Sequence, residues 1–530
     1  MERTASALDS LANGHAAAAP LATTRTPRQE AATAAVLAAV LLGMLGDSLF
    51  RVPGFGVNLV LWVIPALGAI AWVARVRGRN MSAEHWALGA AIVFFAGTFA
   101  WRDAEGLLVF NMLAMLSAFG LLALALSGWP AQLTRASVGE LLVGGASLGF
   151  SAAFGTPALI AGDRALADGG ARPRWRVAMA IARGSLIALP VLLVFGALLS
   201  SADPRFEHVL STLIAIDFAQ TASHIIMAGF IAWVAAGYMR GAAVADHPLG
   251  MSSAWHVPRV LLGITELATV LGLVDALFAL YVALQIPRLF GGAGRVQTTA
   301  GLTVAEYARG GFFELVTVAA LVLPLLIAAA ALVRKDDAPA WRVFRALAIG
   351  MIALVGLMIV SALQRLTLYV ATFGLSEDRV YATAIVVWLA IVFALFAGTV
   401  LRRRDAGFAF AAVISGWLVL AALDVANPQD MIVRTNSERA SRGASFDWEY
   451  ASRLDADAVP ALAEALTRVD NAGRCGVARK LQDVARTEHD ERLGDWRLWN
   501  SSRRRAIDTA RGANAAHILA GCPIQVKTSR

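Results

Sequence analysis

Ionisable and polar side chains inside long apolar stretches are the residues of this sequence best suited to chemistry. Asp217 and His224 lie seven residues apart, about two helical turns, so both would face one side of a helix. A charged side chain in hydrocarbon costs several kcal/mol unless it is paired, hydrated or neutralised. We therefore predict one polar seam through the later half of a membrane helix bundle, formed by Asp217, His224, Glu266, Asp275, Glu314, Arg365 and Tyr369.

Three kinds of role fit such a seam. It can line a proton- or ion-linked path or a substrate pocket, which favours transport or gating, or it can serve catalysis on a lipid-linked substrate. It can also be structural, with Glu266 or Glu314 paired to Arg365 where lipid supplies no hydrophobic drive between helices. Asp47 and Asp424 lie at the ends of their stretches, and we interpret both as solvated span ends.

A glycine-rich loop at 288–311 is a second candidate site. It contains six glycines, and it carries Glu306, Tyr307 and Arg309 near its end. Such a loop can fold over the mouth of a bundle and present these side chains to a ligand. Alternatively, it forms an amphipathic helix in the membrane interface, with the tyrosine as an anchor and the arginine reaching the headgroups.

The sequence lacks the common motifs of enzyme chemistry. The sequence has no phosphate-binding loop ending in Gly-Lys-Ser/Thr, no Gly-x-Ser-x-Gly elbow and no His-Glu-x-x-His helix. Catalytic residues therefore stay unknown, an enzyme is not the favoured class, and no cofactor is predicted. No metal site is predicted either, because the two cysteines and the distant His489 and His517 lack the spacing of zinc ligands.

Composition decides the fold class. The chain is 58% hydrophobic and 16% charged, whereas soluble proteins carry about a quarter charged residues. Its apolar residues form runs of about 18 to 25, the length that crosses a bilayer as a helix. We predict an all-α, polytopic transmembrane bundle with spans near 31–50, 55–74, 84–101, 106–127, 177–199, 212–239, 259–286, 312–333, 346–370, 380–400 and 407–426.

The net charge of +8 does not indicate nucleic-acid binding, because the arginines are grouped beside apolar runs. The bilayer is the predicted partner, and any small-molecule or ion ligand stays unknown.

The segment 138–161, broken by glycines and Pro157, decides the topology. If it does not cross, nearly all arginine clusters lie on one side, as the positive-inside rule requires. We therefore predict a re-entrant or buried segment, a cytoplasmic N-terminus and a periplasmic C-terminal domain in a bacterial inner membrane.

Five regions follow from this topology. Residues 1–30 are a disordered cytoplasmic tail, 31–127 a four-span part, 138–161 the non-crossing segment, 177–426 a seven-span core and 427–530 a soluble helical domain. The last region becomes rich in charge and tryptophan after Asn427 and Pro428, and it offers a surface for a protein partner. It holds Cys475 and Cys522, which in an oxidising compartment form one disulfide, or else remain two buried thiols.

Several motifs occur in an order that is typical of one protein family. They are EYARGGFFEL at 306–315, RLTLY at 365–369 with FGL at 373–375, DAVPAL at 457–462 and DWRLWN at 495–500. Together they resemble a family of bacterial multi-pass membrane proteins catalogued as domain of unknown function 4173. The resemblance implies an uncharacterised inner-membrane protein with a soluble C-terminal extension, and it supplies no substrate or catalytic residue.

Three function classes therefore stay open. A transporter or channel predicts a water-filled cavity that reaches Asp217, Glu266 and Asp275. A membrane enzyme predicts a lateral opening with a carboxylate or histidine at headgroup depth. A scaffold or envelope sensor predicts a dry, fully paired seam and a partner surface on the C-terminal domain.

Overall fold

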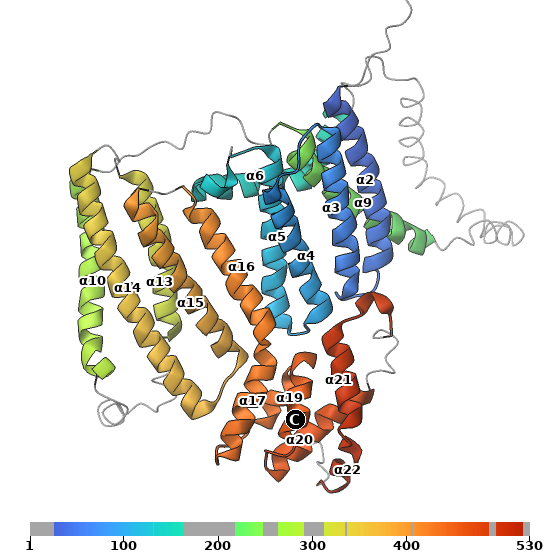
Figure 1. Cartoon of the computed structure of the whole chain (residues 1–530), viewed down its shortest axis with the longest axis vertical. Coiled ribbons are helices and arrows are strands. Elements are labelled where there is room, and N and C mark those ends of the chain that lie inside the picture. Colours follow the sequence, from blue (N-terminus) through green and yellow to red (C-terminus); the bar gives the residue numbers. More distant parts are fainter. Residues whose placement is uncertain are drawn as a thin grey trace, which may run out of the picture.

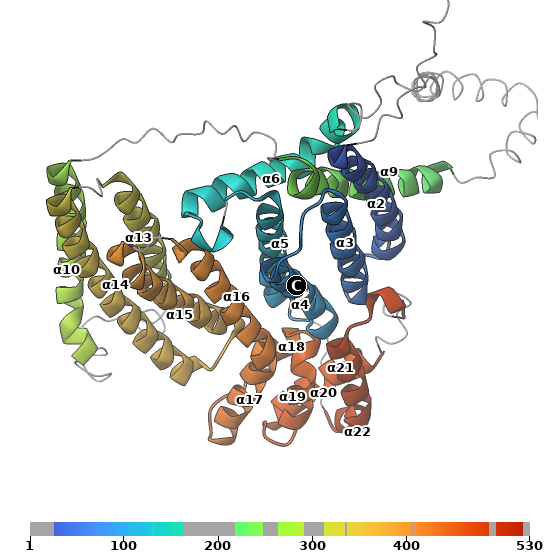
Figure 2. The same ribbon diagram turned by 45° about the horizontal axis from the view of Figure 1, so that its top comes forward.

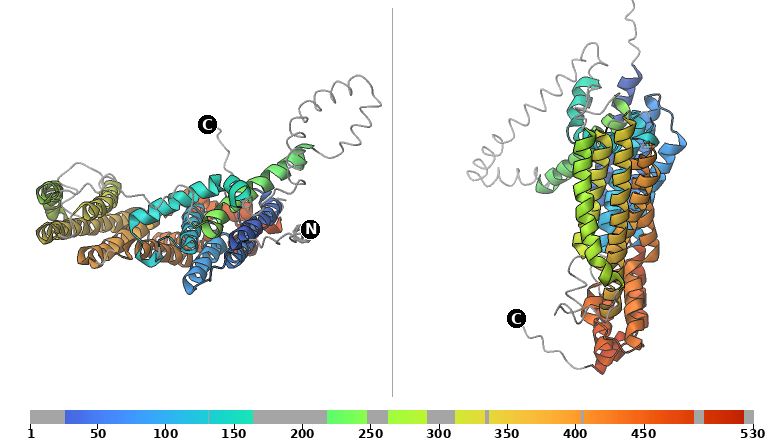
Figure 3. Two further views of the ribbon diagram at one scale, coloured as in Figure 1. Left: turned by 90° about the horizontal axis from the view of Figure 1, so that it is seen from above. Right: turned by 90° about the vertical axis from the view of Figure 1, so that its left-hand side faces the viewer.

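The computed structural model describes residues 26–130, 132–163, 218–246, 263–290, 312–333, 337–403, 406–486 and 494–522. All elements in these ranges are helices. The long helices stand side by side in an elongated array, and a smaller domain made by the end of the chain lies at one end of them (Figures 1 and 3). We call this end the junction end, and the other the opposite end.

Two groups of long helices form the membrane body. The first group is α2 (Pro27–Phe50), α3 (Val57–Val76), α4 (Ala83–Trp101), α5 (Glu105–Ser127) and α9 (Phe218–Met239), whose buried apolar side chains make one core cluster. The second group is α10 (Ile264–Phe290), α13 (Phe312–Leu332), α14 (Ala338–Phe373) and α15 (Glu377–Gly398). The remaining helix, α16 (Phe408–Ala426), packs against both clusters.

Eleven helices in the described residues are long and apolar enough to cross a membrane, which confirms the polytopic helical fold class. Ten of them correspond to predicted spans, with bounds that differ by up to eight residues. The predicted span at 177–199 lies outside the described residues. The eleventh helix is α6 (Val138–Ala158), which covers most of the segment for which we predicted no crossing. Residues 27–30, assigned from sequence to the N-terminal tail, already belong to α2.

Both ends of α6 lie at the opposite end of the bundle. Near its start, Gly144 lies against Leu124 in the last turn of α5. After its end, Asp163 accepts a hydrogen bond from Arg28, at the start of α2, at 2.6 Å. The helix is continuous and about 30 Å long, and it runs across the bundle rather than along it (Figure 2).

Small residues and buried charges fix α6 and α9 at the opposite end. The Cα of Gly237 lies so close to α6 that an added Cβ would meet the Ser151 carbonyl at 2.5 Å. Each helix ends in one π-helical turn, η2 (Leu159–Asp163) and η4 (Arg240–Val244). Buried Asp163 and Arg240, one from each turn, form a 2.7 Å ion pair. Helices of distant sequence are thus joined by close backbone packing and buried charges, as expected in lipid.

The C-terminal domain has its own apolar core. Its helices are α17 (Pro428–Ser441), α18 (Trp448–Arg453), α19 (Val459–Ala465), α20 (Asn471–Arg486), α21 (Ser501–Gly512) and α22 (Ala515–Ala520), with 3-10 turns η6 (Ala456–Ala458) and η8 (Trp496–Leu498). Leu462 and Leu481 are fully buried at its centre. In the structure Cys475 and Cys522 form a disulfide bond that ties α20 to the end of α22.

Candidate functional site

The junction between the membrane helices and the C-terminal domain brings together five buried polar side chains, those of Arg102, Asp424, Asp457, Asn500 and Ser502. Four segments meet there: the loop 102–104 between α4 and α5, the end of α16, turn η6 and the start of α21. Two of the sequence motifs fall at this place, since DAVPAL begins in η6 and DWRLWN ends at the cap of α21. We call the following set the junction network: Arg102, Asp103, Asp424, Asp457, Asn500, Ser502 and Arg503.

Asp457 joins three of these segments through its carboxylate. One oxygen, Oδ2, accepts hydrogen bonds from the backbone N–H groups of Asp103 at 2.6 Å and Ala104 at 2.9 Å. The other, Oδ1, accepts from the Ser502 hydroxyl at 2.6 Å, and it lies 3.5 Å from the Arg102 guanidinium. The residue is only 2% exposed, so these partners replace the water that a carboxylate otherwise needs.

Arg102 extends the junction network into the membrane helices. Its side chain is buried, its Nε donates to the Asp424 carbonyl at 2.7 Å, and its guanidinium stacks 4.4 Å from the Trp101 ring. The side chain of Asp424 in turn accepts a 2.8 Å hydrogen bond from Asn111, which links α16 to α5. The ends of α4, α5 and α16 are therefore joined by polar contacts that lipid cannot replace.

The Asn500 side chain caps two helices. Its amide nitrogen donates to the carbonyls of Phe99 at 2.8 Å and Arg102 at 2.7 Å, so it caps the last turn of α4. Its amide oxygen accepts from the N–H groups of Ser502 and Arg503, so it is also the N-cap of α21. Loss of this side chain would leave the ends of both helices unpaired.

A second set of contacts holds the C-terminal domain to α14 and α15. The Asn436 amide exchanges hydrogen bonds with the backbone of Leu375, at 2.7 and 2.8 Å. Between the two helices Gly374 has φ +82°, and a Cβ there would lie 2.5 Å from the Asn436 amide oxygen. The FGL motif at 373–375 thus has a local explanation, because only glycine tolerates both this conformation and this approach.

The DWRLWN motif also lies at the level where α3 begins. The Val57 N–H donates to the Trp499 carbonyl at 3.0 Å, and the Arg497 guanidinium donates to the Ser48 carbonyl at 2.6 Å. The indoles of Trp496 and Trp499 are 62% and 52% exposed beside the ends of the membrane helices. Exposed tryptophans beside the ends of membrane helices are typical of a membrane interface.

At Asp457 the electrostatics of the junction favour fixed pairing over proton transfer, whereas Asp424 has one buried oxygen, Oδ2, without a hydrogen-bond partner in the described residues. Burial raises the pKa of Asp103, although Arg503 lies 2.6 Å away and opposes that effect. Hydrogen bonds from Arg497 lower the pKa of Asp495. Asp457 has both oxygens occupied by protein donors, so it is poorly placed to act as a base toward a substrate. The arrangement is suited to mechanical connection rather than to catalysis.

The predicted polar seam is divided between the two helix groups. Asp217 lies outside the described residues. In the first group, His224 on α9 is 2.5 Å from Asp47 on α2, which Arg51 also contacts at 2.8 Å. Asp47 is therefore a buried, paired carboxylate, and our interpretation of it as a solvated span end was wrong.

The seam residues of the second group spread along the length of the helices. Leu267 on α10 packs with the start of α14, whereas Val282 packs near Leu366, so α10 and α14 run parallel. Glu266 then lies at the opposite end, where its carboxylate accepts from the Gly263 N–H at 2.9 Å. Arg365 lies toward the junction end, roughly 35 Å away at 1.5 Å per residue, and a Glu266–Arg365 pair is excluded. Glu314 belongs to α13, but its side chain lies outside the described residues.

Two further seam residues have separate surroundings. Asp275 lies midway along α10 with one oxygen 3.5 Å from the position of a Cβ on Gly350, and in the described residues its buried Oδ1 has no hydrogen-bond partner. Tyr369 packs on Phe373 and beneath the Arg379 guanidinium, 4.1 Å away. The loop residues Glu306, Tyr307 and Arg309 lie outside the described residues.

The most connected residues of the junction were missed or misinterpreted from the sequence. Asp424 is fully buried, not a solvated span end: its side chain accepts from Asn111 on α5, and its carbonyl accepts from Arg102. Arg102, which no sequence pattern singled out, is buried, with 5% exposure. One signal was available: Asp457 and Asn500 both stand in the motifs that carried the family resemblance.

Comparison with known proteins identifies the family. Residues 89–465, most of the chain, match the family described as "Domain of unknown function (DUF4153)", and the chain belongs to it. This corrects the family number, 4173, that the motifs suggested, while the expectation of a family of unknown function is confirmed. No curated protein and no solved structure matches the chain. The matched region includes Arg102, Asp424 and Asp457.

Replacing Asp457 tests the junction network. Asp457→Ala leaves Arg102 buried without its carboxylate, and breaking a buried pair costs roughly 3–5 kcal/mol. We expect unfolding of the purified protein at a clearly lower temperature, and faster proteolysis of the C-terminal domain. Asp508→Ala is the control, since Asp508 is 54% exposed in its pair with Arg504 and such pairs contribute about 0–1 kcal/mol. Equal melting of the two variants would contradict the assigned role.

Proposed function

We propose that this member of the DUF4153 family is a bacterial inner-membrane scaffold or sensor. In this role its C-terminal domain is held outside the cytoplasm as a fixed extension of the membrane helices, where it binds a protein partner. The junction network centred on Asp457 is the observation that carries the proposal. The junction network supports a domain that transmits position or force to the membrane body, because the hydrogen bonds of this network would break if the domain turned away from the membrane helices.

The connection between the two parts supports this rigidity. α16 ends at Ala426 and α17 begins at Pro428, so Asn427 alone separates them. Asn427 takes a left-handed conformation at φ 53°, and its side chain caps α17 and donates to the Asp457 carbonyl at 3.3 Å. A flexible tether would instead need a longer, glycine- or proline-rich linker.

The distribution of arginine supports the proposed orientation. Within the described residues, the membrane helices carry five arginines toward the junction end, namely Arg51, Arg102, Arg288, Arg365 and Arg379. At the opposite end they carry Arg28, Arg75, Arg77, Arg79, Arg135, Arg240, Arg342, Arg345, Arg402 and Arg403. Because arginine is retained in the cytoplasm, the opposite end faces the cytoplasm and the disulfide-bonded domain lies outside. α6 is then an in-plane helix at the cytoplasmic end.

Thiol labelling in intact cells tests this orientation. An impermeant maleimide should label Cys475 and Cys522 only after an impermeant reductant has opened the disulfide, and lysis should add no further signal. A single cysteine introduced at Arg345, on the opposite end, should be labelled only after lysis. Labelling of the native pair that requires lysis would place the domain in the cytoplasm and contradict the proposal.

Transport through a polar seam receives less support. A conducting path needs one continuous line of polar groups, whereas His224 and Asp275 belong to separate helix groups in the described residues. Asp275 and Asp424 each have one buried carboxylate oxygen without a hydrogen-bond partner in the described residues, and these oxygens favour an ion-linked role, because an unpaired carboxylate in hydrocarbon is costly.

A complementation experiment separates the two roles. In a strain that lacks the gene, we expect a chain ending at Asn427 to fail to restore the wild-type phenotype while its membrane level stays normal. We expect Asp275→Asn to restore it, since the partner-binding role does not use that carboxylate. If the shortened chain were active and Asp275→Asn inactive at normal abundance, transport would replace the scaffold proposal.

A further inference from the structure

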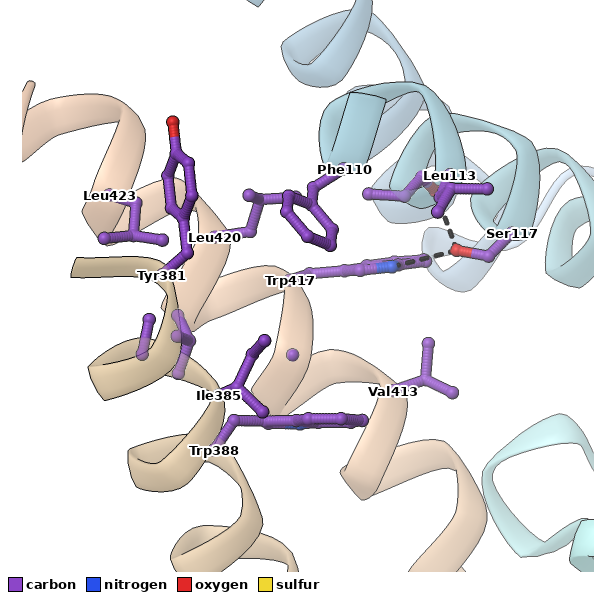
Figure 4. A pocket seen from close by; sticks show the side chains of 14 residues that line it. Phe110, Leu113, Ser117, Tyr381, Ile385, Trp388, Val413, Trp417, Leu420 and Leu423 are labelled. Carbon is purple, nitrogen blue, oxygen red and sulfur yellow. Dashed lines mark hydrogen bonds between the residues drawn. The ribbon is translucent and has the colours of Figure 1, made fainter. Parts of the chain in front are cut away.

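An apolar groove lies between α5, α15 and α16, where the two helix groups meet. It has a volume of about 390 Å³, and its walls include Phe110, Leu113, Tyr381, Trp388 and Trp417. Figure 4 shows their side chains around the open space. Leu113 is 58% exposed, so the groove opens sideways from the bundle rather than into its core. In a membrane this opening faces the acyl chains.

The groove occupies the half of the membrane nearest the C-terminal domain. Along α16 it extends from Val413 to Leu423, one turn before the helix ends at Ala426. Ten residues of helix cover about 15 Å, half of a hydrocarbon core of about 30 Å. Its length and depth therefore match one acyl chain of the adjoining leaflet.

The walls of the groove are fixed by polar contacts. The Trp417 indole N–H donates to the Ser117 hydroxyl at 3.0 Å, and the Trp388 indole N–H donates to the Ala412 carbonyl at 3.3 Å. Gly416 gives Trp388 its room, since a Cβ there would lie 3.2 Å from the indole nitrogen. The two indoles lie as separate flat walls in Figure 4. The groove is therefore preformed rather than a gap that neighbouring side chains could fill.

Carboxylates surround the end of the groove at headgroup depth. The Tyr381 hydroxyl is 3.4 Å from the Glu377 carboxylate. The Gln429 amide donates both to that carboxylate at 2.9 Å and to Asp455 at 3.0 Å, so the two acids lie close together. Glu105 is exposed beside them, and its backbone N–H donates to Asp455 at 3.2 Å. No salt bridge to these three carboxylates occurs within the described ranges.

Arg379, two residues after Glu377, is turned away from this end of the groove, which we call its mouth. The Arg379 guanidinium lies over the Tyr369 ring and donates to the Gly374 carbonyl, on the α14 side. The mouth therefore presents negative charge that a cation can balance, while the groove beneath it presents only apolar walls and aromatic faces. A molecule that combines an ammonium group with an acyl chain complements both.

We propose that this groove binds one phospholipid with an ammonium headgroup, of the phosphatidylethanolamine type, from the leaflet next to the C-terminal domain. One acyl chain fills the space between Trp388, Trp417 and Leu113, and the ammonium group lies at Glu377 and Asp455. The inference stands apart from the scaffold proposal, because it rests on α15 and the groove rather than on Asp457. Both sites share α16, so the bound lipid adjoins the junction.

Native mass spectrometry of the full chain tests the proposal. Delipidated protein is offered phosphatidylethanolamine or phosphatidylglycerol with identical acyl chains, and the lipids retained per protein are counted. We expect the wild type to retain one lipid and to prefer phosphatidylethanolamine about fivefold, the size of one partly screened ion pair. Ala384→Trp, which fills the groove, should abolish retention. Leu273→Trp on the exposed face of α10 is the matched control and should not.

Glu377→Gln keeps the test decisive if the bulky variant folds poorly. Its amide oxygen can still accept from Gln429, so the groove stays intact while one charge is removed. We expect this variant still to retain one lipid. The ratio of phosphatidylethanolamine to phosphatidylglycerol retained should fall toward one. Equal retention of both lipids by the wild type, or equal retention by Ala384→Trp and Leu273→Trp, would indicate annular lipid only and overturn the proposal. A preference for phosphatidylglycerol would overturn it as well.

Discussion

The buried carboxylate of Asp457 is the constraint on which the arrangement of this protein depends. A charge with 2% exposure is stable only with its donors in place, and these come from two segments far apart in the sequence. The loop after α4 supplies backbone N–H groups and Arg102, and the start of α21 supplies Ser502. The first membrane helices and the last helices of the chain are therefore positioned by one side chain.

Sequence patterns predicted the helices well because hydrophobicity is a local property. Ten spans were found with nearly correct bounds, since each depends only on about twenty consecutive residues. The junction was not predicted, because Arg102 and Asp457 are separated by 355 positions and nothing local links them. Asp424 was misinterpreted for the same reason: its partners Asn111 and Arg102 lie more than 300 positions earlier in the chain.

The polar seam shows a second limit of local patterns. Spacing on one helix predicts which side chains share a face, but it does not reveal which helix that face meets. His224 turned out to meet Asp47 on α2, 177 positions earlier, rather than the acids of the later helices. The motifs succeeded better, because DAVPAL, FGL and DWRLWN each contribute to joining the C-terminal domain to the membrane helices.

The central claim is that the C-terminal domain is a rigid extension of the membrane body. The most direct measurement is the distribution of distances between spin labels at Leu116, on the exposed face of α5, and Thr467, on the exposed surface of the domain. In lipid nanodiscs we expect one narrow distribution for the full chain, because the junction permits one arrangement. A broad or multiple distribution in the wild type would show a tethered domain and contradict the account.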